Sequence, residues 1–221
     1  MISYCIAVLR PIYARMLIED LLRKAAVPYA ILVWLNVDDA ELRAFLDSLN
    51  TDGRPRRIIG RSPDNTGMCA YRTLFTAARY ELITQIDEAV LRISPEIAER
   101  AAVIFWAFPK VRQIVADTWQ DEFTTGGRPP IGSYRLVDSD SGLYHGPIDG
   151  WFSIYHRSIF PHLLAIPYAS YFYLSGTVKQ QLSRTGLRGL LCTRMKVFHA
   201  TGTEYASYFR MQDFEIAKYR S

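Results

Sequence analysis

The sequence has few cysteines and no long apolar segment, and each absence excludes a class of protein. Its three cysteines, Cys5, Cys69 and Cys192, fit neither a metal-binding spacing nor a disulfide framework, so we expect buried thiols. No apolar run reaches the roughly 20 residues needed to span a membrane. Residues 2–9 also lack the basic flank and cleavage site of a signal peptide. These absences predict a cytoplasmic protein without a membrane span.

Several phosphate-binding and hydrolase motifs are missing as well. The sequence has no Gly-x-x-x-x-Gly-Lys-Ser/Thr loop, no Gly-x-Gly-x-x-Gly after its first predicted strand, and no Gly-x-Ser-x-Gly turn. It also has no internal repeat and no low-complexity tract. The chemistry of P-loop enzymes and of serine hydrolases is therefore disfavoured, and we expect residues 1–221 to form a single domain.

Basic residues only slightly outnumber acidic ones. The chain has 221 residues, 49% hydrophobic and 22% charged, as in an ordinary folded protein. Its formal charge is +4, and much of the excess lies in two clusters: Arg54, Arg56, Arg57 and Arg61, and Arg184, Arg188, Arg194 and Lys196. Such clusters can hold pyrophosphate or nucleic acid, although a solvated basic face is the simpler interpretation.

The first half of the sequence alternates between strand and helix patterns. In chain order we expect strand 2–9, helix 16–25, strand 29–35, helix 39–49, strand 57–59, helix 68–80 and strand 82–86. Three strand–helix alternations followed by another strand predict an α/β fold. Its sheet should be mostly parallel and doubly wound, that is Rossmann-like, with right-handed crossovers.

The second half is less regular and richer in aromatic residues. Ser94-Pro95-Glu96 is typical of a helix start, with Ser94 as the N-cap and Pro95 at the first helical position. Further along we expect a helix over 111–119, a loop over 126–130, a helix over 178–184, a strand over 194–199 and a helix over 205–219. The dense aromatics after Ile131 indicate either a separate binding surface or a thicker core.

The residues around the fourth predicted strand carry the clearest functional signal. Asn65-x-Gly67 opens a helix of small residues, and the strand that follows ends in Asp87 and Glu88. An open α/β sheet binds its ligands outside the carboxyl ends of its strands. Acidic residues at that position suggest a cation or phosphate site, and the alternative is a solvated acidic pair.

The order of these pieces resembles the nucleotide-sugar glycosyltransferases of the A-type (GT-A) fold, close to the large inverting family 2. The matching pieces are Asn65-x-Gly67 with Ala70-x-Arg72, the strand into Asp87-Glu88, Asp149-Gly150-Trp151 with Arg157, Val197-Phe198-His199, and Lys218-Tyr219. They span most of the chain, and their order carries the resemblance because no single motif is specific. The resemblance implies a nucleotide-sugar-binding half over 1–93 and an aromatic-rich acceptor half over 131–221.

The resemblance also implies a donor site and a metal. Transfer from a nucleoside diphosphate sugar builds negative charge on the leaving diphosphate, which a divalent cation usually neutralises. The implied ligands of Mn²⁺ or Mg²⁺ are Asp87, Glu88 and His199. The implied donor-binding residues are Asn36, Asp38, Asn65, Arg72 and Asp87, and Arg10 could line the same pocket.

Two positions depart from the pattern of the family. Ala89 stands where relatives commonly carry a further aspartate, and Ser175 and Thr177 stand where relatives carry the carboxylate that serves as general base. Three explanations remain open: Asp149 acts as the base, the transfer retains configuration, or the domain binds a nucleotide or glycan without catalysis. The acceptor is open too, and could be a glycan, a small molecule, a protein or a modified nucleic acid.

Overall fold

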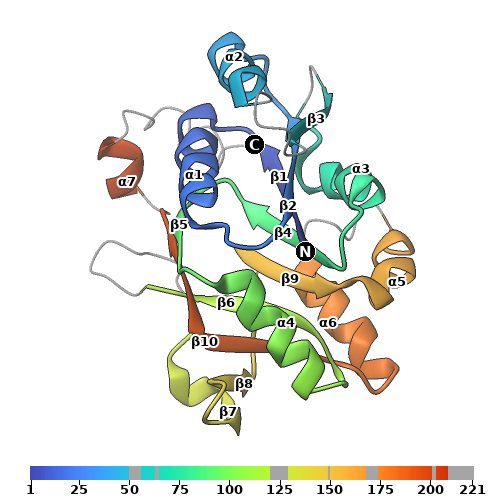
Figure 1. Ribbon diagram of the computed structural model, residues 1–221. Helices are drawn as coiled ribbons and strands as arrows, with labels where there is room; N and C mark the ends of the chain where they lie inside the picture. The colour runs from blue at the N-terminus through green and yellow to red at the C-terminus, as the bar shows by residue number, and fades with distance from the viewer. Residues whose placement is uncertain are drawn as a thin grey trace.

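The first half of the chain folds as strand and helix in strict alternation, as a computed structural model shows (Figure 1). The structure describes residues 1–49, 56–62, 65–119, 129–148, 150–167, 174–200 and 203–208. The elements of this half are β1 (Ile2–Val8), α1 (Pro11–Lys24), β2 (Tyr29–Leu35), α2 (Ala40–Ser48), β3 (Arg56–Arg61), α3 (Ala70–Ala77) and β4 (Leu82–Asp87). Each of the four predicted strands and three predicted helices is therefore present.

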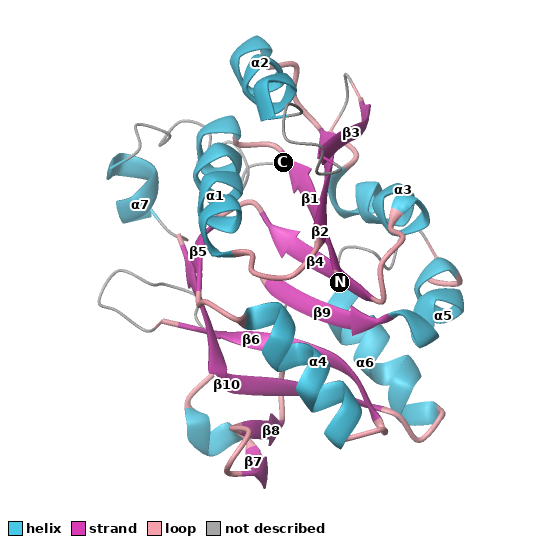
Figure 2. Cartoon of the chain, in the orientation of Figure 1, coloured by secondary structure: helices cyan, strands magenta, loops and turns pink. Residues whose placement is uncertain are grey.

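The second half adds more strands to the same sheet (Figure 2). Its elements are β5 (Val90–Ile93), α4 (Ile97–Ala107), β6 (Val111–Thr118), β7 (Arg135–Asp138), β8 (Leu143–His145), β9 (Phe152–His156), α5 (Phe160–Leu164), α6 (Leu174–Arg184), β10 (Arg188–His199) and α7 (Thr203–Tyr208). The strands follow the order β3-β2-β1-β4-β9-β6-β10-β8-β7, and β5 pairs with β10.

The central strands mostly run in one direction. β3, β2, β1 and β4 pair in parallel, and so do β6 and β10. β9 lies between β4 and β6 and pairs antiparallel with both, so β6 has the same direction as β4. The α/β prediction with a mostly parallel sheet is confirmed.

Helices cover both faces of this sheet. One apolar cluster joins the strands to α1, α2 and α4, and a second joins them to α3, α5 and α6. Fully buried side chains such as Leu17 on α1 and Leu74 on α3 provide the contacts. The chain therefore crosses from one face of the sheet to the other between β3 and β4. The result is the doubly wound arrangement that the alternation predicts.

The helix predicted over 111–119 is wrong, because those residues form β6. The strand is buried along nearly its whole length between β9 and β10, and its buried polar side chains have partners: Gln113 Nε2 donates to the Ser175 carbonyl, and Asp117 forms an ion pair with Lys196. Val111, Ile114 and Val115 recur at i, i+3 and i+4, which is the spacing of a helix face, so the pattern indicates a helix although the segment is a strand. Val111, Ile114 and Val115 are β-branched, which favours the extended form.

The helix start predicted at Ser94 is also displaced. The helix begins at Ile97, and its N-cap is Glu96, whose φ of 58° lies in the left-handed region. Ser94 instead extends the pairing with β10: its backbone N–H donates to the Lys196 carbonyl at 2.7 Å, and its hydroxyl accepts from the Lys196 N–H at 3.1 Å. Of the helix predicted over 205–219, α7 covers the start, and residues 209–221 lie outside the described part of the chain.

Asp39 provides a local test of the fold. It is the N-cap of α2, and its side chain accepts a hydrogen bond from the Leu42 N–H at 2.6 Å. We expect Asp39→Ala to lower the free energy of unfolding by about 1 kcal/mol, because one helical N–H loses its partner. Urea unfolding measures this change. Asp47→Asn, an exposed substitution on the same helix, should leave the midpoint within error, and an equal loss there would contradict the capping role.

Candidate functional site

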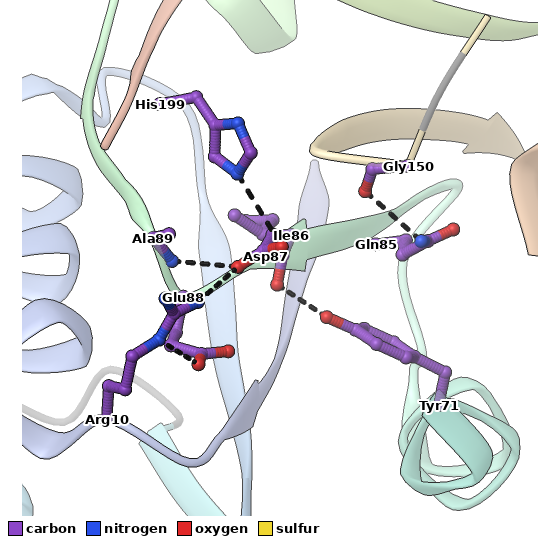
Figure 3. A network of polar contacts seen from close by, with 9 residues as sticks. All are labelled: Arg10, Tyr71, Gln85, Ile86, Asp87, Glu88, Ala89, Gly150 and His199. Carbon is purple, nitrogen blue, oxygen red and sulfur yellow. Dashed lines mark hydrogen bonds and ion pairs between the residues drawn. The ribbon is translucent and has the colours of Figure 1, made fainter. Parts of the chain in front are cut away.

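The reversal between β1 and β4 creates the point at which a doubly wound sheet binds its ligands. Arg10 follows β1, and Asp87 and Glu88 stand at the end of β4. Figure 3 shows that these side chains meet. The Arg10 Nε atom donates to Glu88 Oε1 at 2.9 Å, and an Arg10 terminal nitrogen lies 3.4 Å from Asp87 Oδ1. The topology therefore brings one cation and two carboxylates together at the predicted edge.

His199 reaches this group from β10, which pairs with β5 shortly after Glu88. It ends β10, and its Nε2 atom lies 3.6 Å from Asp87 Oδ2 (Figure 3). Its side chain is 10% exposed, and its ring lies beside Trp151, with 6.3 Å between the ring centroids. The predicted meeting of Asp87, Glu88 and His199 at one edge agrees with this geometry, whereas their role as metal ligands stays a prediction.

The two carboxyl groups have different electrostatic environments. Burial disfavours the ionised form of Asp87, but the close approach of the His199 ring, the charge of Arg10 and the Ala89 N–H together outweigh it and lower the pKa of Asp87. For Glu88, burial and the neighbouring charge of Asp87 outweigh Arg10 and raise the pKa. Asp87 is therefore the carboxylate that stays ionised and available to a cation or a donor.

The raised pKa of Glu88 makes stability depend on pH. When the pKa of a carboxyl group is higher in the folded chain than in the unfolded chain, the free energy of unfolding of the protein falls as the pH rises from the unfolded-state pKa through the folded-state pKa. Glutamine does not ionise, so Glu88→Gln should not show this loss. The free energy of unfolding of Glu88→Gln minus that of the wild type should therefore increase as the pH rises from below 4.5, the ordinary pKa of glutamate, towards 7. Urea unfolding at several pH values measures it. A difference that does not vary with pH would contradict the assignment.

The residues present fit a divalent cation in part. Neither ring nitrogen of the buried His199 has a hydrogen-bond partner within the described residues, and Nε2 faces Asp87 Oδ2. Mg²⁺ is usually held by one or two carboxylates together with substrate phosphates, so Asp87 suits such a cation, and the Nε2 atom of His199 offers a second ligand atom beside it. No group of three or more His, Cys, Asp or Glu side chains in the described ranges is arranged as a metal site. Glu88 is engaged by Arg10 instead.

Ala89 shows why a further carboxylate is missing. Its side chain is fully buried in a small apolar cluster with Tyr13, Leu91 and Ala200. Its carbonyl accepts from the Ala200 N–H at 2.8 Å, and its own N–H donates to Asp87 Oδ1 at 2.9 Å. An aspartate at this position would place a charge among apolar groups. Apolar packing therefore accounts for alanine at this position, and the Ala89 N–H orients the Asp87 carboxylate.

The donor-binding candidates near β2 form a second, linked group. Asn36, which follows β2, accepts hydrogen bonds at Oδ1 from the Thr66 N–H at 3.0 Å and the Thr66 hydroxyl at 2.7 Å. Asn65 accepts from the Gly67 N–H at 2.8 Å and is exposed. These bonds fix the turn into α3, where Gly67 has a φ of 52°. The Asn65-x-Gly67 motif is thus a built turn held from the end of β2.

Three other predicted residues lie differently. Asp38 is exposed and forms ion pairs with Arg43 at 2.5 Å and Arg61 at 3.8 Å. Arg72 lies partly buried on α3. Asp149, the predicted base, lies outside the described residues. Its neighbours are described, however. The Asp87 N–H donates to the Trp151 carbonyl at 2.9 Å, so the segment that follows Asp149 is tied to the end of β4.

A buried polar network, which we did not predict, supports that segment. Gln85 Nε2 donates to the Gly150 carbonyl at 3.1 Å (Figure 3), and Gln85 Oε1 accepts from the Tyr155 hydroxyl at 2.7 Å and from the Ser175 hydroxyl at 3.1 Å. Ser153 lies 2.8 Å from Ser175. A polar residue inside the apolar strand 82–86 was the available signal. Gln85 thus connects β4 with the Gly150 segment and the start of α6.

Removal of Gln85 should be costly. We expect Gln85→Leu to lower the free energy of unfolding by about 2–3 kcal/mol, because buried partners such as the Tyr155 hydroxyl and the Gly150 carbonyl lose a hydrogen bond. Tyr155→Phe should cost about 1 kcal/mol, since it removes one member of the network. Chemical denaturation of both variants and of the double variant measures the coupling. Strictly additive losses would show that Gln85 and Tyr155 act independently.

Ser175, one of the two residues at which the resemblance places the base, lies at the start of α6. It is 2% exposed and its hydroxyl is part of the network around Gln85. Its carbonyl accepts from Gln113 Nε2 at 3.1 Å. Ser175 therefore stabilises the start of α6, and an uncharged side chain suits this buried position.

Comparison with known proteins shows likeness in structure only. No protein-family model and no curated protein sequence matches the chain. Among solved structures, the mannosyltransferase PcManGT from Pyrobaculum calidifontis, in complex with GDP-Man and Mn²⁺, aligns over 94% of this chain and 59% of its own, with a TM-score of 0.69 and 11% identity. GalNAc-T7 with UDP, GalNAc and Mn²⁺ aligns over 100% and 50%, with a TM-score of 0.70 and 12% identity.

S. aureus TarS (residues 1–349) is a third similar structure. It aligns over 97% of this chain and 65% of its own, with a TM-score of 0.67 and 10% identity. The chain thus spans between half and two thirds of the length of these structures. The likeness establishes the GT-A fold, as the order of sequence motifs predicts. None of the described helices is long and apolar enough to cross a membrane.

Proposed function

We propose that the protein is a glycosyltransferase that binds a nucleoside diphosphate sugar at the edge formed by β1, β4 and β10. The observation that carries this proposal is the convergence of Asp87, Glu88 and His199 at the switch point of a GT-A fold. Residues 1–93 form the donor half, and residues 131–221 form the acceptor half. PcManGT and GalNAc-T7, which share the fold, were solved with nucleotides and Mn²⁺, and this supports the same donor class here.

The donor is held by groups from several strand ends. Asn36 and Asp38 face the base or ribose, and Asn65 and Arg72 contact the diphosphate. Asp87 and His199 hold a divalent cation, Mn²⁺ or Mg²⁺, which when bound neutralises charge on the diphosphate as it leaves. Asp87 suits this role because its lowered pKa keeps it ionised. Its backbone and side-chain hydrogen bonds to Trp151 and Ala89 orient it before the donor arrives.

The acceptor hydroxyl needs a base, and Asp149 is our candidate. The Gly150 and Trp151 carbonyls are anchored to β4 through Gln85 and Asp87, which keeps this segment beside the donor site. Ser175 cannot take the role, because a buried serine accepts no proton at neutral pH. The acceptor itself is a glycan, a small molecule, a protein or a modified nucleic acid.

Turnover is the test of this function. The protein should be incubated with a panel of uridine and guanosine diphosphate sugars, with Mn²⁺ or Mg²⁺ and without an acceptor, and the release of nucleoside diphosphate should be followed. We expect slow hydrolysis of at least one donor, since water can replace the acceptor. Binding of a nucleotide without hydrolysis of any donor, even with candidate acceptors added, would refute the enzymatic function.

The second candidate is a binding module that has lost catalysis. Ser175, buried where the base is expected, and Ala89, buried where a further aspartate is expected, favour it. Such a module would still bind a nucleotide or glycan at the same edge. Measured donor hydrolysis that disappears in Asp87→Asn would exclude it.

A further inference from the structure

Arg10 is a buried arginine that contacts both carboxylates of the site. Its side chain is 6% exposed, and its guanidinium spans both carboxylates, with Nε on Glu88 and a terminal nitrogen near Asp87 Oδ1 (Figure 3). The ring of the buried Tyr13 lies against the guanidinium, 5.1 Å from ring centroid to Cζ. Pro11 starts α1 directly after Arg10 and restricts the backbone of Arg10 to the extended region, where its φ is −116° and its ψ is 93°. The guanidinium is therefore a fixed part of the site.

The oxygens of Asp87 are divided between two tasks. Oδ1 accepts from the Ala89 N–H and faces Arg10, whereas Oδ2 faces His199 Nε2 at 3.6 Å. The Arg10 guanidinium thus occupies the place at which a cation could contact both Asp87 and Glu88. The side shared by Asp87 and His199 is left for a cation from solution.

We propose that Arg10 is a built-in counterion that competes with divalent cations for the Asp87–Glu88 pair and keeps the affinity of the free protein for them low. Arg10 places one positive charge against this pair, so the site is one charge less attractive to a cation from solution than it would be without the guanidinium. A bound diphosphate brings its own negative charge. The cation therefore enters with the nucleotide rather than before it. The inference rests on the proposed function only for this last step.

The test measures Mn²⁺ binding in the absence of nucleotide, by electron paramagnetic resonance of free Mn²⁺. Arg10→Met removes the charge and keeps much of the stem, and we expect it to bind Mn²⁺ at least about tenfold more tightly than the wild type. Arg10→Lys keeps the charge and should bind like the wild type. Arg15→Met is the matched control, because Arg15 lies on α1 in an exposed pair with Glu19. Unchanged or weaker Mn²⁺ binding by Arg10→Met would overturn the inference.

Arg10→Met leaves two buried carboxylates without their cation, and it could fail to fold for that reason. The same comparison is therefore made in a Glu88→Gln background. There Arg10→Met makes the charge of the site more negative by one unit, with only one carboxylate of the pair present. We expect the double variant to bind Mn²⁺ about tenfold more tightly than Glu88→Gln alone. Equal affinities would overturn the inference.

The outcome separates this inference from the proposed function, because no nucleotide is present. A protein that follows the predicted Mn²⁺ series and binds no nucleotide keeps the role of Arg10 and loses the transferase function. A protein that binds and hydrolyses a donor but shows no effect of Arg10 on Mn²⁺ keeps the function and loses the counterion role.

Discussion

Asp87→Asn is expected to reduce kcat/KM for donor hydrolysis by about a thousandfold. The substitution keeps the shape of the side chain and removes the charge that would hold a cation beside the leaving diphosphate. Loss of one electrostatic group of this kind typically costs a factor of about 10² to 10³. Because Oδ1 also accepts from the Ala89 N–H, asparagine can keep that hydrogen bond, so the fold should survive. Steady-state kinetics with thermal unfolding as a fold check measure both.

The matched control is Asp140→Asn, which neutralises an exposed aspartate near the β7–β8 turn. It should leave kcat/KM within about twofold of the wild type. Wild-type kinetics in Asp87→Asn would show that the carboxylate at the end of β4 has no part in the reaction.

Asp149→Asn is expected to lower kcat for transfer by a factor of about 10² to 10⁴, the usual contribution of a general base. Donor affinity should change little, since Asp149 is assigned to the acceptor hydroxyl and not to the diphosphate. Transfer kinetics together with nucleotide titrations separate the two effects. The profile of kcat against pH should also lose its acidic limb, because the group that must be deprotonated is gone.

Two other outcomes are informative. A normal kcat in Asp149→Asn would support transfer that retains configuration and needs no such base. An equal loss of donor affinity would instead place Asp149 in the donor site. Either result would contradict the role of Asp149 as base.

The fold could be predicted because its evidence in the sequence is local and repeated. Strands such as β1 and β2 are short, continuous apolar runs, whereas the small residues of α3 recur on one helix face, so the two types of element have different sequence patterns. The strand β6 was assigned wrongly because its apolar residues Val111, Ile114 and Val115 have the spacing of a helix face and polar residues interrupt them. The Ser94 position failed for a different reason, because pairing with β10 took the hydroxyl that a helix N-cap would use.

The site could be predicted in part for a similar reason. Asp87 and Glu88 follow directly from the end of an apolar strand, and the topology rule places ligands there. Arg10 was only a possible lining residue, since nothing local shows that an arginine after β1 will meet residues 77 and 78 positions later in the chain. The network around Gln85 is likewise built from long-range contacts, up to 90 positions apart for Ser175.

The difference between Ala89 and its expected aspartate shows what the structure adds. The sequence reveals the absent carboxylate, and burial against Tyr13 and Ala200 explains why the position is apolar. Tyr13 of the same cluster lies against the Arg10 guanidinium, and the Ala89 N–H donates to Asp87, so the apolar cluster and the charged groups form one local arrangement.

Titration calorimetry tests most directly whether a nucleoside diphosphate binds at Asp87. Uridine and guanosine diphosphates should be titrated into the wild type and into Asp87→Asn, each with and without Mn²⁺. We expect one nucleotide to bind the wild type in a Mn²⁺-dependent manner. At a concentration of about 100 times its Kd, that nucleotide should raise the free energy of unfolding of the protein by roughly 2.7 kcal/mol. Asp87→Asn should lose this binding. No binding of either nucleotide to the wild type, or equal Mn²⁺-dependent binding to both proteins, would contradict the claim.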